Sequence, residues 1–216
     1  MKYNLKNELL KIKKGIFLLD KIAVVLVFTL LGIFSPEYVV MVAYAAIIGY
    51  LFISKRKILL KHLWVATGIS VIWLLVSKNQ YGYAENYLTV FGYNLFPLFT
   101  LPIALLGMYV VYAQAVRLIS NKTAVKKSLL FLSMYWPVLI IAEFIGYNWL
   151  NIHNQATAMY SGLPFCNCFH APLWMQISYF SFGPLFMLAT YLIGIKNPYL
   201  PEVEAEPSII PPAKNF

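Results

Sequence analysis

The 216-residue sequence has few charged side chains and very few acidic ones. Asp and Glu total eight against 17 Lys and Arg, and charged residues make up 12% of the chain, about half of their share in soluble proteins. Hydrophobic residues make up 61%, which is more than a soluble fold of this size can bury. The shortage of charge excludes a soluble globular domain and predicts an all-α, polytopic membrane protein.

Several catalytic signatures are also missing. The sequence has no serine nucleophile motif, no glycine-rich phosphate loop and no H-E-x-x-H signature. Nucleotide chemistry is therefore not predicted, and any chemistry must come from polar residues in the apolar helices or in the loops that join them.

Six apolar runs are long enough for helices that cross a bilayer core, which takes about 20 residues. They are Ile16 to Phe34, Tyr38 to Ile53, Leu60 to Ser77, Leu95 to Ile119, Leu129 to Gly146 and Leu173 to Ile195. Every Lys and Arg except Lys78 falls on one side of this six-span arrangement. By the positive-inside rule that side is the cytoplasm, so both termini are predicted to be cytoplasmic in a multi-pass protein of the plasma membrane. The net charge of +9 then indicates orientation and attraction to membrane lipid, and no nucleic-acid partner is predicted.

Three regions follow from this arrangement. Residues 1–15 form a basic segment suited to the membrane surface, and residues 16–195 form the membrane domain. The first run has no A-x-A cleavage site after it and is expected to remain as a span. Residues 196–216 are rich in Pro and Glu, which predicts a disordered tail.

The unusual polar residues gather in and near the two long outer loops, 78–94 and 147–172. Glu143 lies inside an apolar run, about one turn from the outer end of the fifth span, where an ionisable side chain is costly unless it faces a polar cavity. It is the strongest single candidate for a functional residue. The alternative is a structural glutamate that reaches the interface or bonds a neighbouring helix.

The only two cysteines, Cys166 and Cys168, lie in the second outer loop with His153 and His170. A disulfide between residues separated by one position is not expected, because the ring that it closes is small. Two thiols and two imidazoles could instead bind zinc or copper(I). The alternative is that the cysteines line the loop as small apolar side chains while His170 hydrogen-bonds the start of the sixth helix.

A set of short motifs resembles the membrane family of carotenoid hydratases. The motifs are Tyr81-x-Tyr83, Phe96-Pro97-Leu98 at the start of an apolar helix, Glu143, and Tyr160-x-Gly162-Leu163-Pro164-x-x-Asn167. The sequence departs from the family after Asn167, where Cys168-Phe169-His170 replaces Gly-Trp. The resemblance covers roughly residues 80–180 and implies an enzyme that hydrates the terminal alkene of a lipophilic isoprenoid or carotenoid.

Hydration of an alkene needs a proton donor, shelter for a tertiary cation and a delivered water. Glu143 in its protonated form would be the donor. Aromatic faces would stabilise the cation, and amide or imidazole groups would hold the water. The candidates for these two roles are Tyr83, Trp149 and Tyr160 for the cation, and Asn148, Asn167 and His170 for the water.

Three functions remain open from the sequence. The first is an integral membrane enzyme that modifies an isoprenoid or carotenoid by hydration or isomerisation. The second is a transporter or metal-handling protein that uses Glu143 and the Cys and His residues. The third is a non-catalytic subunit whose outer loops bind a partner, and the oligomeric state is open in all three.

Overall fold

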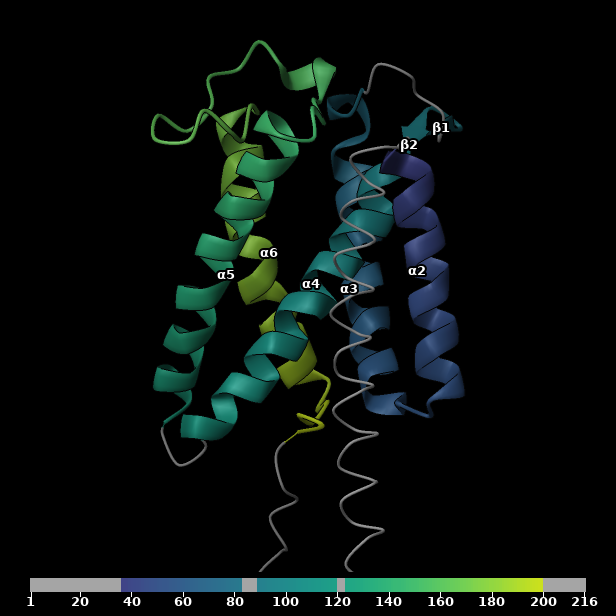
Figure 1. Cartoon of the computed structure of the whole chain (residues 1–216), viewed down its shortest axis with the longest axis vertical. Coiled ribbons are helices and arrows are strands. Elements are labelled where there is room, and N and C mark those ends of the chain that lie inside the picture. The colour runs from purple at the N-terminus through teal and green to yellow at the C-terminus, as the bar shows by residue number, and fades with distance from the viewer. Residues whose placement is uncertain (1–35, 83–88, 120–122, 200–216) are drawn as a thin grey trace, which may run out of the picture.

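The computed structural model describes residues 36–82, 89–119 and 123–199. This part of the chain is mostly helical (Figure 1). Its long helices are α2 (Pro36–Ile53), α3 (Lys57–Val76), α4 (Phe96–Ala115), α5 (Ala124–Asn148) and α6 (Leu173–Leu192). Short 3₁₀ turns are η1 (Lys78–Gln80), η2 (Val116–Ile119) and η3 (Gln155–Thr157). The predicted first span, the basic segment 1–15 and residues 200–216 of the tail lie outside the described residues.

Three of these helices, α3, α4 and α5, are long and apolar enough to cross a membrane, and α2 contains a shorter apolar stretch, Tyr38–Ile53. The chain therefore has the helical character of a membrane protein. Each of the last five predicted runs coincides with a helix to within a few residues. The largest shift is at α5, which begins five residues before the predicted Leu129 because Thr123 caps it by accepting a hydrogen bond from the Lys126 amide at 3.5 Å.

The two long loops lie together at one end of the bundle, as the alternation of basic residues requires (Figure 1). The Gln155 amide donates to the Gly82 carbonyl at 2.7 Å. The Asn154 side chain accepts from the Gly82 amide at 3.0 Å and donates to the Gln80 carbonyl at 2.6 Å. These bonds join the end of η1 to the start of η3, so the described start of the first long loop and the second long loop form one connected cap.

A small β-hairpin in the first loop is an addition to the predicted all-α fold. Strand β1 (Thr89–Val90) pairs antiparallel with β2 (Tyr93–Asn94). The two residues between them, Phe91 and Gly92, have φ of 50° and 77°, as a two-residue hairpin turn of the I′ type needs. Strands of two residues are too short to give an alternating pattern, so the sequence does not predict them.

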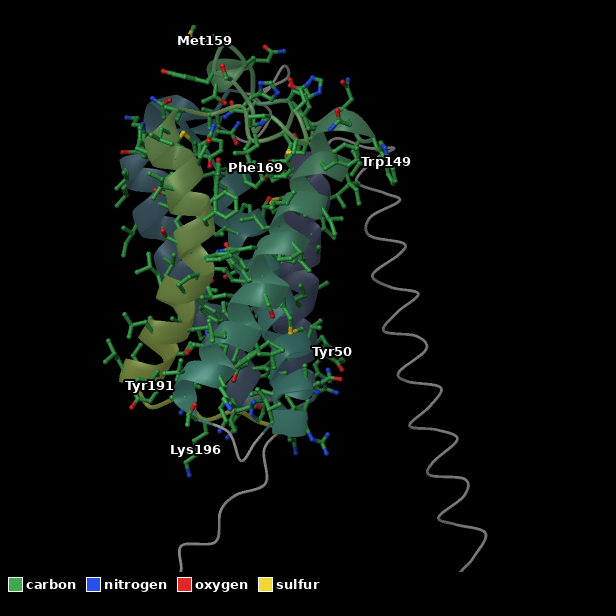
Figure 2. All side chains as sticks on the ribbon, turned by 90° about the vertical axis from the view of Figure 1, so that its left-hand side faces the viewer. Tyr50, Trp149, Met159, Phe169, Tyr191 and Lys196 are labelled. Atoms are coloured by element: carbon green, nitrogen blue, oxygen red, sulfur yellow. A yellow bond between two sulfur atoms is a disulfide. The ribbon has the colours of Figure 1, made fainter. Side chains whose placement is uncertain are left out.

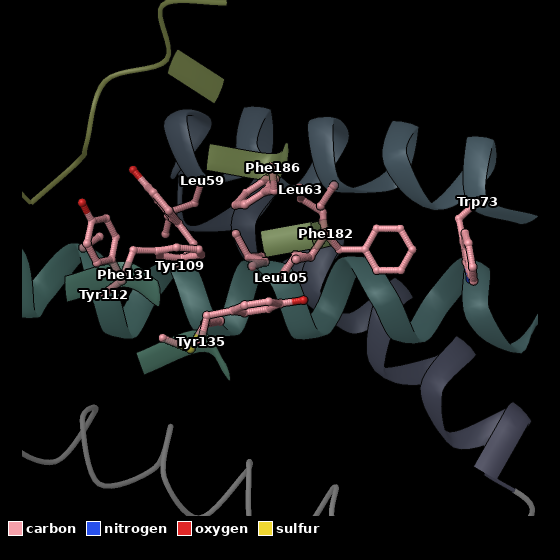
Figure 3. Close-up of a cluster of buried hydrophobic side chains, with 14 of the residues drawn as sticks. Leu59, Leu63, Trp73, Leu105, Tyr109, Tyr112, Phe131, Tyr135, Phe182 and Phe186 are labelled. Carbon is pink, nitrogen blue, oxygen red and sulfur yellow. The ribbon is translucent and has the colours of Figure 1, made fainter. Parts of the chain in front are cut away.

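The core of the bundle is rich in aromatic residues, and α2, α3, α4, α5 and α6 all contribute to it; Figure 3 shows part of this cluster. The Trp73 ring of α3 packs edge-on against Phe182 of α6, with centroids 4.8 Å apart. A buried hydrogen bond joins α3 to α4, because the Ser70 hydroxyl donates to the Pro97 carbonyl at 2.8 Å. These contacts fix α4 and α6 on the same side of α3 and thereby position the site.

The proline inside α6 is compensated by α5. Pro184 has no N–H, so the carbonyl of Phe180 one turn earlier loses its helical donor. The Trp136 indole of α5 donates to that carbonyl at 3.1 Å. A helix-breaking residue can be accommodated in an apolar setting when a neighbouring helix supplies the missing bond.

Candidate functional site

A cavity of about 170 Å³ lies between α3, α4, α5 and α6 near the end with the long loops. Its walls are mainly apolar and aromatic, and Glu143 is the only carboxyl among the described residues that line it. The volume is close to the roughly 150 Å³ of an engineered protein cavity that binds one benzene ring. The space therefore fits one ring-sized end of a longer apolar molecule.

The α5 wall follows from helical periodicity. Tyr135, Leu139, Ala142 and Glu143 all line the cavity, at spacings of four, three and one residues that keep them on one face of the helix. The Tyr135 and Glu143 positions are eight residues apart, or about 12 Å along the axis. The cavity is therefore an elongated slot along α5, with the carboxyl toward the end of the bundle that carries the long loops.

A chain of hydrogen bonds forms the wall opposite α5. The Trp73 indole donates to the Tyr81 hydroxyl at 2.7 Å, and that hydroxyl lies 2.8 Å from the hydroxyl of Tyr179. Burial raises the pKa of Tyr81, its hydrogen bonds to Tyr179 and Trp73 oppose this, and the charge of Glu143 adds to it. Tyr81 therefore keeps its proton at neutral pH, and it lines the same cavity as Glu143.

Tyr135 is held in the cavity wall from two sides. Its hydroxyl donates to the Tyr179 carbonyl at 2.6 Å. Its ring lies against Gly183 of α6, where a Cβ would come within 2.7 Å of the ring carbons. The absence of a side chain at position 183 is what lets α5 and α6 approach so closely, and it sets the width of the slot.

The cavity opens toward the apolar outside of the bundle. Within the described part of the chain, three of its lining residues, Ala104 of α4 and Val138 and Ala142 of α5, are exposed. All three are small or aliphatic, and no charge lies among them. A lipophilic molecule could therefore enter from the side, between α4 and α5.

The second outer loop contains a disulfide between Cys166 and Cys168, so the expectation that these two cysteines would not pair is wrong. The physical reason is a tight turn that the sequence did not indicate. Asn167 adopts a φ of 44°, the Leu163 amide donates to the Cys168 carbonyl at 2.8 Å, and the two cysteine Cα atoms lie 5.2 Å apart. That separation is within the range of ordinary disulfides.

The loop motif that begins at Tyr160 has a structural role in this turn. The His170 ring nitrogens lie 2.9 Å from the Tyr160 carbonyl and 3.1 Å from the Asn167 carbonyl. A Cβ on Gly162 would be only 2.7 Å from the Cys168 carbonyl oxygen. The motif thus fits residues that fold the cap, with His170 as the link between its two arms.

Most of the predicted site residues lie away from the cavity. Tyr160, Asn167 and His170 are in the cap and do not line it. Trp149 is 72% exposed, and the Asn148 side chain donates to the Phe144 carbonyl within its own helix at 3.1 Å. Tyr83 lies outside the described residues, so Glu143 is the one predicted catalytic residue that the structure places at the cavity.

The four predicted metal ligands are only partly brought together. His153 and His170 both pack against the ring of Tyr147, with centroids 4.1 and 4.5 Å away. The sulfurs of Cys166 and Cys168 are joined to each other and are not thiolate ligands in this form. Among the described residues, no three His, Cys, Asp or Glu side chains gather in a way that could hold a metal. A zinc or copper site stays a prediction, and it would require the reduced cysteines.

The aromatic residues of the cavity were not among the predicted site residues, although Tyr81 belongs to the Tyr81-x-Tyr83 motif. Trp73, Tyr81, Tyr135 and Tyr179 are aromatic residues near helix ends or in apolar helices, where an aromatic belt or core position is the ordinary expectation. For Tyr135 a signal does exist, because it lies two turns from Glu143 on the same face of its helix. The other three come from different segments, and only packing brings them to the carboxyl.

His62 in α3 is another buried polar residue that the sequence did not single out. Its side chain is fully buried and its ring stacks on Tyr109 with centroids 4.0 Å apart. Nδ1 lies 2.8 Å from the Ile58 carbonyl, whereas Nε2 has no hydrogen-bond partner among the described residues. His62 does not line the cavity, so it is not part of the candidate site.

No protein-family model, curated protein or solved structure matches the chain. The candidate site is therefore defined by the cavity, its one carboxyl and its aromatic wall.

Proposed function

We propose that the protein crosses the plasma membrane of the cell six times, with both termini in the cytoplasm. Of the described basic residues, only Lys78 lies at the end of the bundle that carries the long loops. The Cys166–Cys168 disulfide lies in the second of these loops, and disulfides persist mainly in oxidising, non-cytoplasmic compartments. These two observations independently support an outward orientation of the cap.

Reporter fusions test this topology. Fusions after Lys57 and after Lys127 should stay cytoplasmic, and a fusion within residues 151–162 should be exported. A cytoplasmic signal from the last fusion would contradict the six-span arrangement.

The proposed activity is acid-catalysed hydration or isomerisation of a terminal alkene in an isoprenoid or carotenoid. The observation that carries it is the position of Glu143 as the only described carboxyl in an elongated, aromatic cavity of about 170 Å³. The cavity matches one end group of such a molecule, and the rest of a long polyene would extend through the apolar opening into lipid. The short-motif resemblance to carotenoid hydratases supports the same substrate class.

The chemistry needs only the groups that line the cavity and, for hydration, a water. Glu143 would transfer its carboxyl proton to the less substituted alkene carbon, which leaves a tertiary cation on the neighbouring carbon. In hydration, water adds to that cation and its extra proton returns to the Glu143 carboxylate. In isomerisation, the carboxylate removes a proton from an adjacent carbon, so the double bond moves without a change in composition.

The aromatic wall would stabilise the cation. The rings of Trp73, Tyr179 and Phe182 all line the cavity, and each ring face that meets a desolvated cation contributes about 0.5–2 kcal/mol. The paired hydroxyls of Tyr81 and Tyr179 are the polar groups best placed to hold a water there. Tyr81 and Tyr179 thus replace the cap residues Asn167 and His170 in the proposed water-binding role.

The decisive experiment expresses the protein in a host that makes acyclic or monocyclic carotenoids and analyses the extracted lipids by mass spectrometry. Glu143→Gln should abolish product formation with normal protein levels, because the amide keeps the size of the side chain but delivers no proton. Ser133→Ala on the same helix is the matched control, since Ser133 is exposed and is not among the residues that line the cavity. Full activity of Glu143→Gln would refute the proposal.

Labelled water separates the two reactions. Deuterium from heavy water should enter the product in either reaction, whereas oxygen-18 from labelled water should enter only on hydration. Tyr179→Phe should retain more activity than Tyr179→Leu, because the ring face is kept. The expected loss for Leu is about two- to thirtyfold, which corresponds to the 0.5–2 kcal/mol above.

A further inference from the structure

A second, larger cavity of about 530 Å³ lies at the opposite end of the bundle, between the start of α3 and the end of α6. Its lining combines two lysines, Lys61 and Lys196, with apolar side chains that include Trp64 and Ile193. Trp64 is 54% exposed and Ile193 is 65% exposed, so this is an open groove on the outside of the bundle. Neither the candidate active site nor the proposed reaction uses it.

Each wall of the groove combines one lysine with apolar side chains. On α3, Lys61 lies between Ile58, which precedes it by three residues, and Trp64 and Val65, which follow it by three and four, so all four lie on one face of the helix. On the other wall, Ile193 at the end of α6 precedes Lys196 at the edge of the molecule. Figure 2 shows Lys196 at the end of the molecule opposite Met159 of the cap. The groove thus presents two cationic groups among apolar side chains.

The segment that carries Lys196 is fixed by specific bonds. Gly194 adopts a φ of 73°, its amide donates to the Tyr191 carbonyl at 3.0 Å, and the Ile195 amide donates to the Thr190 carbonyl at 2.9 Å. This pair of bonds is a Schellman motif that ends α6 and turns the chain. The Asn197 side chain then donates to the Ala113 carbonyl of α4 at 3.3 Å. The lysine is therefore held beside the groove by a defined backbone.

The positive charge at this end has no counter-charge in the described part of the chain. The one carboxylate among the side chains that the structure describes is Glu143, near the end of α5. That end of α5 carries the long loops (Figure 1). Within the described side chains, therefore, no carboxylate lies beside Lys61 or Lys196.

We propose that this groove binds one anionic phospholipid of the inner leaflet, with its phosphate between Lys61 and Lys196 and its acyl chains along Trp64 and Ile193. A volume of about 530 Å³ is within the usual range of ligand pockets, about 300–1,000 Å³. It is large enough for a headgroup and the first part of the chains. Lysines near a membrane surface attract anionic lipid by about 1 kcal/mol each. The proposal rests on the membrane character of the helices and on the proposed topology, and not on the chemistry at Glu143.

Trp64 provides a direct probe of the groove. The other four tryptophans are replaced by Phe, and the variant is reconstituted in phosphatidylcholine vesicles that contain a small fraction of brominated phosphatidylglycerol or brominated phosphatidylcholine. Bromine quenches indole fluorescence on contact, so brominated phosphatidylglycerol should quench Trp64 more strongly. Native mass spectrometry of the protein with all its tryptophans, after incubation with phosphatidylglycerol or phosphatidylcholine, gives the same comparison if the single-tryptophan variant does not fold.

Paired lysine variants test whether the preference belongs to the groove. Lys61→Gln with Lys196→Gln should reduce the preference for phosphatidylglycerol by up to about thirtyfold, which corresponds to about 1 kcal/mol per lysine. Lys126→Gln with Lys127→Gln is the matched control, because these lysines lie at the same end of the bundle but do not line the groove. The control should keep the preference.

Three results would overturn the proposal. The first is equal quenching and equal retention of the two lipids by the protein with its lysines intact. The second is an equal loss in both double-lysine variants, which would indicate general surface charge. The third is a marked gain in phosphatidylglycerol preference after removal of residues 200–216, because the glutamates of the tail would then be the occupant. The two proposals can fail separately. If the protein prefers phosphatidylglycerol as expected but forms no product in the carotenoid-producing host, the lipid proposal stands and the proposed enzyme activity fails.

Discussion

Replacement of Gly183 by alanine tests the packing that defines the candidate active site. A Cβ at this position would lie 2.7 Å from a ring carbon of Tyr135 and 2.8 Å from two more. These ring atoms belong to a stiff side chain whose hydroxyl is also held by the Tyr179 carbonyl. The ring must therefore move, and α5 must move with it or the hydrogen bond must break.

The expected magnitude follows from three contributions. Overpacking of a well-packed core costs about 1–3 kcal/mol, and loss of the Tyr135 hydrogen bond adds about 0.5–1.5 kcal/mol. Alanine in place of glycine inside a helix stabilises the folded state by about 0.5–1 kcal/mol, which offsets part of this loss. The free energy of unfolding should therefore fall by about 0.5–4 kcal/mol.

Two further variants make the sign of the effect diagnostic. In a Tyr135→Ala background the clash is gone, so Gly183→Ala should become neutral or stabilising by up to about 1 kcal/mol. Gly107→Ala in α4 is the matched control, because no described atom lies within 4 Å of its Cβ position. It should also be neutral or slightly stabilising.

The measurement is unfolding in mixed micelles with increasing sodium dodecyl sulfate, followed by tryptophan fluorescence. If Gly183→Ala is as stable as Gly107→Ala when Tyr135 is present, the close approach of α5 and α6 is not real. The slot beside Glu143 would then lose its structural basis, so this measurement also tests the geometry on which the proposed activity depends.

Two other variants test the cap and the proline in α6. Gly162→Ala should open the cap, because its Cβ would be 2.7 Å from the Cys168 carbonyl oxygen; faster proteolysis at the cap checks this, and an unchanged rate would contradict it. Trp136→Phe should cost about 1 kcal/mol by removing the donor to the Phe180 carbonyl, measured by the same detergent unfolding. In a Pro184→Ala background the restored amide should take over that bond, so an undiminished effect of Trp136→Phe there would exclude the proposed compensation.

The helices were predictable because hydrophobic runs in a membrane protein are long and continuous. The run Tyr38 to Ile53 and α2 end at the same residue, since the basic residues after it end both the apolar pattern and the helix. What the sequence could not give is the way the helices pack. The relevant contacts are Ser70 on the Pro97 carbonyl and Trp136 on the Phe180 carbonyl, and they join segments that no periodic pattern relates.

The cap shows why short loops are harder to predict than spans. The disulfide was judged from the sequence separation of Cys166 and Cys168 alone. Its formation instead depends on a turn in which Asn167 adopts a positive φ and Gly162 leaves room for the Cys168 carbonyl. Positive φ is uncommon at residues other than glycine, and although Asn adopts it more readily than most, the sequence pattern does not show which Asn will do so.

Glu143 was identified by the cost of placing a carboxyl in an apolar helix, and that criterion needs no knowledge of its neighbours. The two tyrosines proposed to hold water beside it could be identified only from their contacts with each other in the packed structure. A buried tyrosine costs little free energy when its hydroxyl makes one hydrogen bond. Tyr179 in α6 and Tyr81 in the first long loop therefore stand out only when their hydroxyls are seen 2.8 Å apart. A catalytic acid in a membrane can thus be proposed from the sequence, whereas the polar groups that would hold water beside it emerge only from the packed helices. For this reason the proposed water site has moved from Asn167 and His170 in the cap to the tyrosine pair in the cavity wall.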